Sequence, residues 1–161
     1  YDRYAKEWTP EASYKMMQEC IREVREKGIS IDAILAANDQ LATGVIKALE
    51  ENEKAGEIPV TGMDADLNAI KNILKGKQSM TAYKPVKTLV HTAAQAAINL
   101  AKNGKIEKIN ETVNNGRKLV ESIIVQPQVI NQANVRATVI NDGYWTKEQV
   151  FGKTPSKEVP K

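Results

Sequence analysis

The stretch "IDAILAANDQLATGVIKALEEN", residues 31–52, decides the fold class of this chain. Its first seven residues, 31–37, form a nearly continuous apolar run, which is typical of a strand buried on both faces of a sheet. From position 38 onward the apolar residues instead recur at helical spacing: Leu41, Val45, Ile46 and Leu49. The sequence therefore predicts a strand that leads directly into an amphipathic helix over 38–52.

Other segments repeat this alternation. The stretch "EIPVTGMDADLNAI" contains an apolar run over 57–61, a glycine, and then a helical pattern that begins at Asp66. A third strand is predicted over 79–83, and apolar spacing upstream predicts a helix over 9–27. This order predicts an α/β fold in which a parallel sheet, flanked by helices, is connected by right-handed crossovers.

The remaining part of the chain is less regular. Apolar residues predict a helix over 86–103, and Asn-Asn-Gly at 114–116 predicts a turn. A β-rich run follows at 118–130. Beyond it we expect a short helix or loop and a small strand at "ATVIND", residues 137–142, and then a disordered polar tail at 151–161.

Composition narrows the class of function. The chain has 161 residues and a net charge of +3 with the charges interspersed, so it lacks the basic stripe typical of nucleic-acid binding. No run approaches the roughly 18 apolar residues that a membrane span needs. We therefore expect one globular α/β chain that does not bind nucleic acid.

Few residues are suited to catalysis or metal binding. The single cysteine, Cys20, excludes an internal disulfide and a CxxC metal site, and we expect it in the core beside Met16, Met17 and Val24. The only histidine, His91, lies on the polar stripe of its helix, so we expect it at the surface. The sequence thus predicts no enzymatic activity, no cofactor and no metal.

The two carboxylates of "GMDAD" raise the question of a calcium site. Asp64, Asp66 and Asn68 match the opening D-x-D-x-N of a calcium loop, but its sixth position is Ala69 and its twelfth is Lys75. A calcium loop requires glycine and glutamate at those positions. Asp66 directly precedes a helix and is well placed as its N-cap. Asp64 is then either a simple loop residue or a ligand to something other than a metal.

Three predicted parallel strands each end in a strong polar group. Asn38 follows the first strand, Asp64 the second and Lys84 the third. Because the carboxyl ends of parallel strands lie along one edge, where open α/β sheets bind ligands, we expect these side chains to share a site. An amide, a carboxylate and an ammonium suit the hydroxyls of a small polyhydroxylated molecule. Trp8 is a candidate plate for the C–H face of such a ligand.

Each of these four residues also has a simpler interpretation. Asn38 is also well placed as a helix cap, and Lys84 as a surface lysine before a proline. Asp64 fits an ordinary loop, and Trp8 fits plain packing.

The residues singled out above also carry a resemblance. The segments "IDAILAANDQLATGVIKALEE", "IPVTGMDADLNAIKNILKGKQSMTAYKP" and "TVNNG" closely resemble D-xylose-binding proteins of the type I periplasmic sugar-binding superfamily, over roughly residues 5–145. By position, Trp8 resembles the stacking tryptophan of that family. Asn38, Asp64 and Lys84 resemble its polar sugar ligands. Asp66 has no ligand role by this resemblance.

The resemblance implies a periplasmic-binding-protein-like fold of two lobes, of which this chain matches the second. Residues 1–85 and 118–150 are expected to form the C-terminal lobe. Residues 86–117 are expected to be a crossover segment of the N-terminal lobe, and 151–161 a tail. Because family members are about twice as long, we expect the N-terminal lobe to be in another chain or to have been removed.

The resemblance also implies a function. Family members are extracytoplasmic solute-binding proteins, periplasmic or anchored as lipoproteins, that close around one monosaccharide and deliver it to an ABC permease. D-xylose is the expected sugar. Two alternatives remain: a xylose sensor subunit that signals to a membrane histidine kinase, and the effector-binding domain of a LacI-type transcription regulator.

Overall fold

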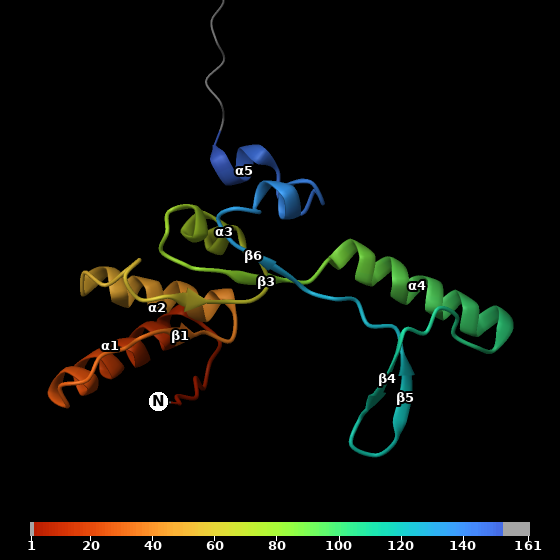
Figure 1. Ribbon diagram of the computed structural model, residues 1–161, viewed down its shortest axis with the longest axis horizontal. Coiled ribbons are helices and arrows are strands. Elements are labelled where there is room, and N and C mark those ends of the chain that lie inside the picture. Colours follow the sequence, from red (N-terminus) through yellow and green to blue (C-terminus); the bar gives the residue numbers. More distant parts are fainter. Residues whose placement is uncertain (1, 153–161) are drawn as a thin grey trace, which may run out of the picture. The chain divides into compact units, whose positions relative to one another are not determined.

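The computed structural model of the protein describes residues 2–152, which form two compact units (Figure 1). The first unit contains the chain up to Tyr83 and again from Val129, and the second is Lys84–Gln128. The lobe boundary expected between residues 117 and 118 therefore lies inside the second unit.

The first three strands of the chain form the predicted parallel arrangement. The strands of the first unit are β1 (Ile34–Leu35), β2 (Val60–Thr61), β3 (Thr81–Tyr83) and β6 (Gln128–Ile130). β1 and β2 are parallel, with Ile34 opposite Val60. A parallel bridge between Met63 and Ala82 joins the end of β2 to β3, which pairs with β6. The prediction of three neighbouring parallel strands is confirmed, although each strand is shorter than its apolar run.

Burial of the first strand differs from the expectation. Residues 31–37 are half-buried or exposed, and Leu35 is 88% exposed, so the prediction that this run is buried on both faces is wrong. The reason is pairing: among the described residues, β1 has a strand partner on one side only.

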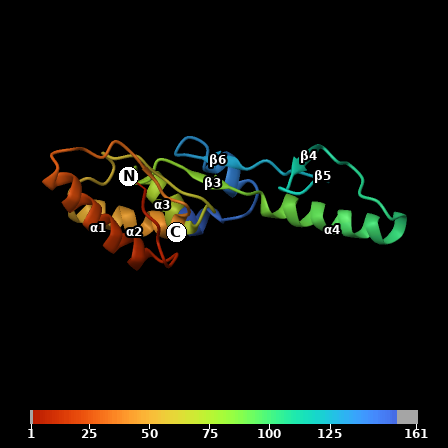
Figure 2. The same cartoon turned by 90° about the horizontal axis from the view of Figure 1, so that it is seen from below.

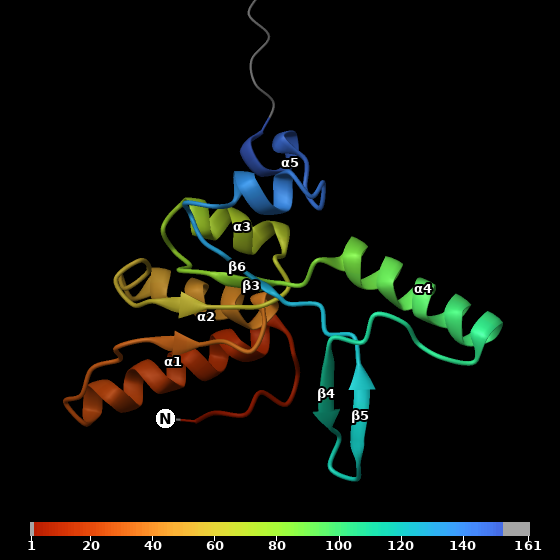
Figure 3. The same ribbon diagram turned by 45° about the vertical axis from the view of Figure 1, so that its right-hand side comes forward.

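Three helices of the first unit lie where the sequence predicts them. They are α1 (Pro10–Glu26), α2 (Asp39–Glu51) and α3 (Leu67–Leu74). α1 begins after Thr9, whose hydroxyl accepts a hydrogen bond from the Ala12 N–H at 3.2 Å. α1 and α2 lie side by side in Figures 1, 2 and 3. They approach closely at Gly44, because a Cβ there would lie 2.0 Å from the Pro10 carbonyl oxygen.

Two apolar clusters form the core of this unit. One lies between α1, α2 and the first strands and includes Met17, Leu49 and Val60. The other contains α3 residues together with Tyr83 of β3 and residues of the C-terminal segment, such as Val139. The segments that follow β1, β2 and β3 thus start from strands that packed helices hold in place.

The C-terminal segment is helical where a small strand was expected. Arg136–Ile140 forms a π-helical turn, η1, and Lys147–Phe151 forms α5. The strand predicted at 137–142 is wrong. The physical reason is that Val135 and Val139, four residues apart, are both buried in the α3 cluster, and the Thr138 hydroxyl donates to the Asn134 carbonyl at 2.7 Å.

The second unit contains one helix and one hairpin. α4 (Val86–Asn103) matches its prediction, and β4 (Glu111–Asn114) pairs antiparallel with β5 (Leu119–Ser122) around the predicted turn. No residue of α4 is buried, and His91 is exposed as expected. Among residues 2–152 no helix is both long and apolar enough to cross a membrane. Phe151, the first residue of the tail expected at 151–161, ends α5, and residues 153–161 of that tail lie outside the described residues.

Candidate functional site

The segments that follow the first two strands are tied together at one edge of the sheet. The Asp39 N–H donates to the Met63 carbonyl at 2.9 Å, and the Asp64 N–H donates to the Ala82 carbonyl at 2.9 Å. The first bond links the start of α2 to the loop after β2, and the second links that loop to β3. Asn38 and Asp64 are therefore held on neighbouring strand ends of the same edge.

Asn38 is the N-cap of α2. Its Oδ1 accepts from the Leu41 N–H at 2.9 Å, and the residue is half-buried. The cap fixes the side chain through Oδ1 alone, so the Nδ2 group of the same amide remains a hydrogen-bond donor that the cap does not use. The capping interpretation is confirmed, and it is compatible with a second role as a ligand.

The loop that carries Asp64 has an unusual backbone. Asp64 has φ +104° and Ala65 has φ +57°, values in the left-handed region that residues with a Cβ rarely adopt. Such conformations cost about 1–3 kcal/mol each and persist only where surrounding contacts hold them, most often at ligand sites. The loop 62–66 therefore has a backbone conformation that surrounding contacts must hold in place.

Residues far away in the sequence hold this loop. The Ala65 N–H donates to the Thr81 hydroxyl at 3.1 Å, and the Trp145 indole N–H donates to the Ala65 carbonyl at 2.7 Å. The Tyr144 hydroxyl lies 3.4 Å from the Asp64 carbonyl oxygen and donates to it. Sequence reasoning missed Tyr144 and Trp145. The available signal was an aromatic pair after a Gly in a chain with only 5% aromatic residues.

Asp39 places a buried ionisable group at this edge of the sheet, because the residue is only 1% exposed. It accepts hydrogen bonds from the Asp66 N–H, the Gln78 amide and the Thr81 hydroxyl, each at 2.9 Å. Burial raises the pKa of the Asp39 carboxyl above its ordinary value, and these hydrogen bonds oppose that rise.

The structure changes the interpretation of Asp66. It occupies the N-cap position of α3 as predicted, but its side chain makes no capping hydrogen bond. The carboxylate instead accepts from the Gln40 amide of α2 at 2.5 Å. The prediction of a side-chain cap is therefore wrong, because a donor on the neighbouring helix takes the carboxylate. No group of three metal-binding side chains occurs between residues 2 and 152.

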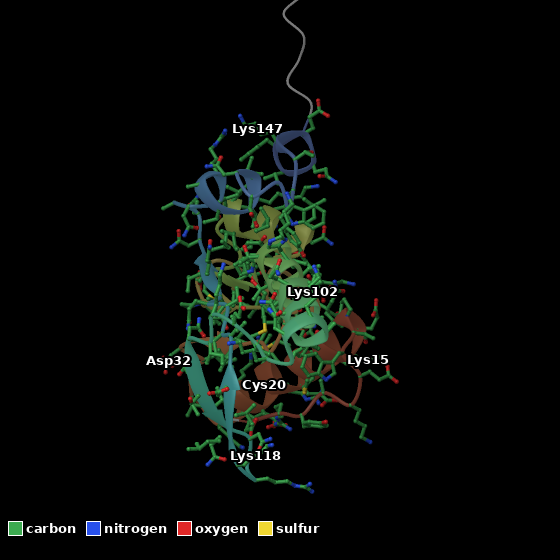
Figure 4. The ribbon with its side chains drawn as sticks, turned by 90° about the vertical axis from the view of Figure 1, so that its right-hand side faces the viewer. Lys15, Cys20, Asp32, Lys102, Lys118 and Lys147 are labelled. Carbon is green, nitrogen blue, oxygen red and sulfur yellow. The ribbon has the colours of Figure 1, made fainter. Side chains whose placement is uncertain are left out.

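Trp8 lies at a cavity between α1 and the β1 segment. The side chain is 58% exposed, and the cavity of about 860 Å³ is also lined by Ala37, the residue before Asn38. Cys20 lines the same cavity and is half-buried, so it is not the core residue expected from the sequence (Figure 4). Cys20 borders this cavity and stays partly accessible, whereas Met17 and Val24 of the same helix are buried.

Lys84 follows β3 directly in the chain and is exposed. It is the first residue of the second unit. Its participation in a site with Asn38 and Asp64 stays a prediction.

The chain is similar in sequence to known proteins. Residues 1–106, about two thirds of the chain, match the family described as periplasmic binding protein domain. This chain belongs to that family. Within the periplasmic binding protein domain family, the D-xylose-binding periplasmic protein of Haemophilus influenzae is 38% identical over 150 residues, which is 93% of this chain and 44% of that protein. Its namesake from Escherichia coli is 39% identical over 149 residues, which is 92% of this chain and 44% of that protein.

Solved structures agree with this family membership. A carbohydrate transporter solute-binding protein from Chloroflexus aurantiacus, solved in complex with D-glucose, superposes with a TM-score of 0.77 at 30% identity, covering 87% of this chain and 41% of that one. The chain thus spans less than half the length of the family members it matches, and the α/β fold predicted from the sequence is confirmed.

Proposed function

We propose that this chain is the second lobe of an extracytoplasmic receptor that binds one monosaccharide between two lobes for uptake by an ABC permease. One observation carries the proposal: Asn38 and Asp64 end neighbouring parallel strands, and Asp64 is held at positive φ by hydrogen bonds from distant segments. Strain of this kind is retained where a side chain must be presented to a ligand. No catalytic step is involved.

The donor and acceptor types explain how a sugar would be held. The Asp64 carboxylate accepts from sugar hydroxyls, while the Nδ2 group of Asn38 and the ammonium of Lys84 donate to them. Hydrogen bonds to charged groups are worth roughly 1.5–3 kcal/mol once water is excluded. Trp8, with its exposed ring, supplies the apolar surface for the C–H face of the sugar.

D-xylose is the proposed sugar. The supporting fact is that two relatives at 38% and 39% identity are named D-xylose-binding periplasmic proteins. A solved relative at 30% identity holds D-glucose, which is D-xylose with an added hydroxymethyl group, so glucose is the competing ligand to test. The names of these relatives also support an extracytoplasmic location.

The proposed partners follow from the same relationship. A complementary N-terminal lobe would supply the remaining sugar contacts. The assembled receptor would close around the sugar, because the sugar contacts both lobes only in the closed state and so shifts the population toward it. The closed form would then dock on the permease.

Replacing Asp64 tests the proposal. Asp64→Asn keeps a residue type that tolerates positive φ but removes the charge. In a receptor with the complementary lobe restored, we expect affinity for D-xylose, measured by calorimetry against D-glucose, to fall by tenfold or more, on the order of 1.5–3 kcal/mol. Circular dichroism should not change.

Glu26→Gln is the matched control, since Glu26 is an exposed carboxylate at the end of α1. It should bind as tightly as the wild type. An Asp64→Asn receptor with undiminished affinity would refute the assignment of Asp64 as a ligand.

A further inference from the structure

We propose that Asp39 is a positioning residue for sugar binding, whose buried carboxylate holds the loop 62–66 in the conformation that presents Asp64. This inference rests on the proposed function. Asp39 does not contact the ligand in this proposal. It acts through the backbone on either side of Asp64.

The same residue holds the loop before and after Asp64. The backbone N–H of Asp39 donates to the Met63 carbonyl at 2.9 Å, and its Oδ2 accepts from the Asp66 N–H at 2.9 Å. Met63 and Asp66 enclose the two residues with positive φ. A single residue at the start of α2 thereby sets both borders of the strained segment, one through its backbone N–H and the other through its carboxylate.

Thr81 extends this hold to the residue between those borders. Its hydroxyl donates to Asp39 Oδ2 at 2.9 Å and accepts from the Ala65 N–H at 3.1 Å. Because the Thr81 hydroxyl proton is directed at Asp39, the lone pairs of the hydroxyl oxygen face the Ala65 N–H. The Asp39 carboxylate thus orients the acceptor that holds Ala65 at positive φ.

Gly62 shows how closely the loop passes the carboxylate. A Cβ at Gly62 would lie 2.1 Å from Asp39 Oδ1 and 2.6 Å from the Gln78 amide nitrogen. No side chain fits there, so the backbone of the loop packs directly against the Asp39–Gln78 pair. The glycine of "GMDAD" is therefore explained by this close approach.

The stability of the fold alone does not explain a buried carboxylate at position 39. Its desolvation is costly, and well-packed apolar residues often stabilise a core as well or better. All three groups that donate to Asp39 are neutral, and two of them lie in or hold the strained loop. Charge-assisted bonds are stronger than neutral ones, which suits an acceptor that must maintain an unfavourable backbone. Asp39 also adjoins Asn38, so one residue links both proposed ligands.

The experiment is Asp39→Asn in the receptor with its complementary lobe. Asparagine keeps the shape of the Asp39 side chain but has one acceptor oxygen in place of two. Its NH₂ group would face hydrogen-bond donors instead of an acceptor. We expect D-xylose affinity to fall about tenfold or more, and the amide hydrogens of Ala65 and Asp66 to exchange faster while those of α2 keep their rates. A structural role alone would not produce this local change together with lost affinity.

Two further variants make the test decisive. Ser13→Ala removes a buried hydroxyl elsewhere in the same unit and should leave affinity and loop exchange unchanged. Thr81→Val keeps the shape of a buried residue and removes the acceptor of the Ala65 N–H, so it should shift both readouts in the same direction as Asp39→Asn. In the double variant, the loss of binding free energy should be smaller than the sum of the two single losses. Should Asp39→Asn fail to fold, Thr81→Val alone decides.

Unchanged affinity or unchanged loop exchange in these loop variants, with a wild type that binds, overturns the inference and leaves the proposed function intact. A wild-type receptor that binds neither D-xylose nor D-glucose overturns the proposed function, and this role with it.

Discussion

At the scale of single residues, the site depends on backbone conformation as much as on side-chain chemistry. Asp64 and Ala65 adopt positive φ without being glycine, and the Trp145 indole contributes one of the contacts that hold them. This contact joins residues 80 positions apart in the chain. A side chain from the bend between η1 and α5 thereby stabilises a loop next to the proposed sugar ligands.

Trp145→Phe tests this contact. The substitution keeps an aromatic ring beside Tyr144, whose ring centroid lies 5.2 Å from that of Trp145, but it leaves the Ala65 carbonyl without its indole donor. An unsatisfied buried group costs about 1–3 kcal/mol, so the free energy of unfolding in urea should fall by that amount. Tyr4→Phe, at an 87% exposed position, is the control and should have no effect. Equal stability of both variants would show that Trp145 does not hold the loop.

At the scale of elements, the packing of α1 against α2 positions the N-terminus of α2, where Asn38 and Asp39 lie. α1 crosses α2 at Gly44, where the Pro10 carbonyl occupies the space of a side chain. α4 differs from these helices because its apolar side chains, including Leu89, Val90 and Ile98, are exposed. Its helical pattern is clear, and none of its residues is buried. That its packing partner belongs to the complementary lobe stays a prediction.

Gly44→Ala tests the close packing of α1 on α2. Alanine favours a helix over glycine by about 1 kcal/mol, but the new Cβ would lie 2.0 Å from Pro10 backbone and force the helices apart. Overpacking of this kind costs about 1–3 kcal/mol, so we expect a lower melting temperature. Lys15→Ala, at an exposed position on α1, should change stability by less than about 0.5 kcal/mol. A stabilised Gly44→Ala protein would contradict this packing.

At the scale of the whole molecule, the chain spans 44% of the length of its D-xylose-binding relatives. Proposed ligands from this chain would contact one side of a sugar. The remaining contacts, and the exclusion of water that strengthens all of them, would come from the complementary lobe.

The isolated chain should therefore bind D-xylose at least about a hundredfold more weakly than the two-lobed receptor, which corresponds to roughly 2.7 kcal/mol. Calorimetry on both proteins at the same temperature and salt concentration measures the difference. Equal affinity would mean that the site is complete within this chain and that closure between lobes contributes nothing to binding.

The sequence by itself determined the helices α1 to α4, the strands β1 to β3 and their order. Helical spacing of apolar residues and capping residues such as Thr9 and Asn38 act between near neighbours, so they are readable without a structure. The parallel order of three strands followed from their alternation with helices. The same local logic placed Asn38 and Asp64 on one edge.

Only the tertiary structure decided how that edge is built. The positive φ of Asp64, and the hydrogen bonds that Asp39 and the pair Tyr144–Trp145 make with its loop, depend on contacts between segments far apart in the chain. The strand expected at 137–142 and the cap expected from Asp66 were wrong for the same reason. Local propensity is weak, and burial against α3 or a donor on α2 outweighs it once the chain has folded.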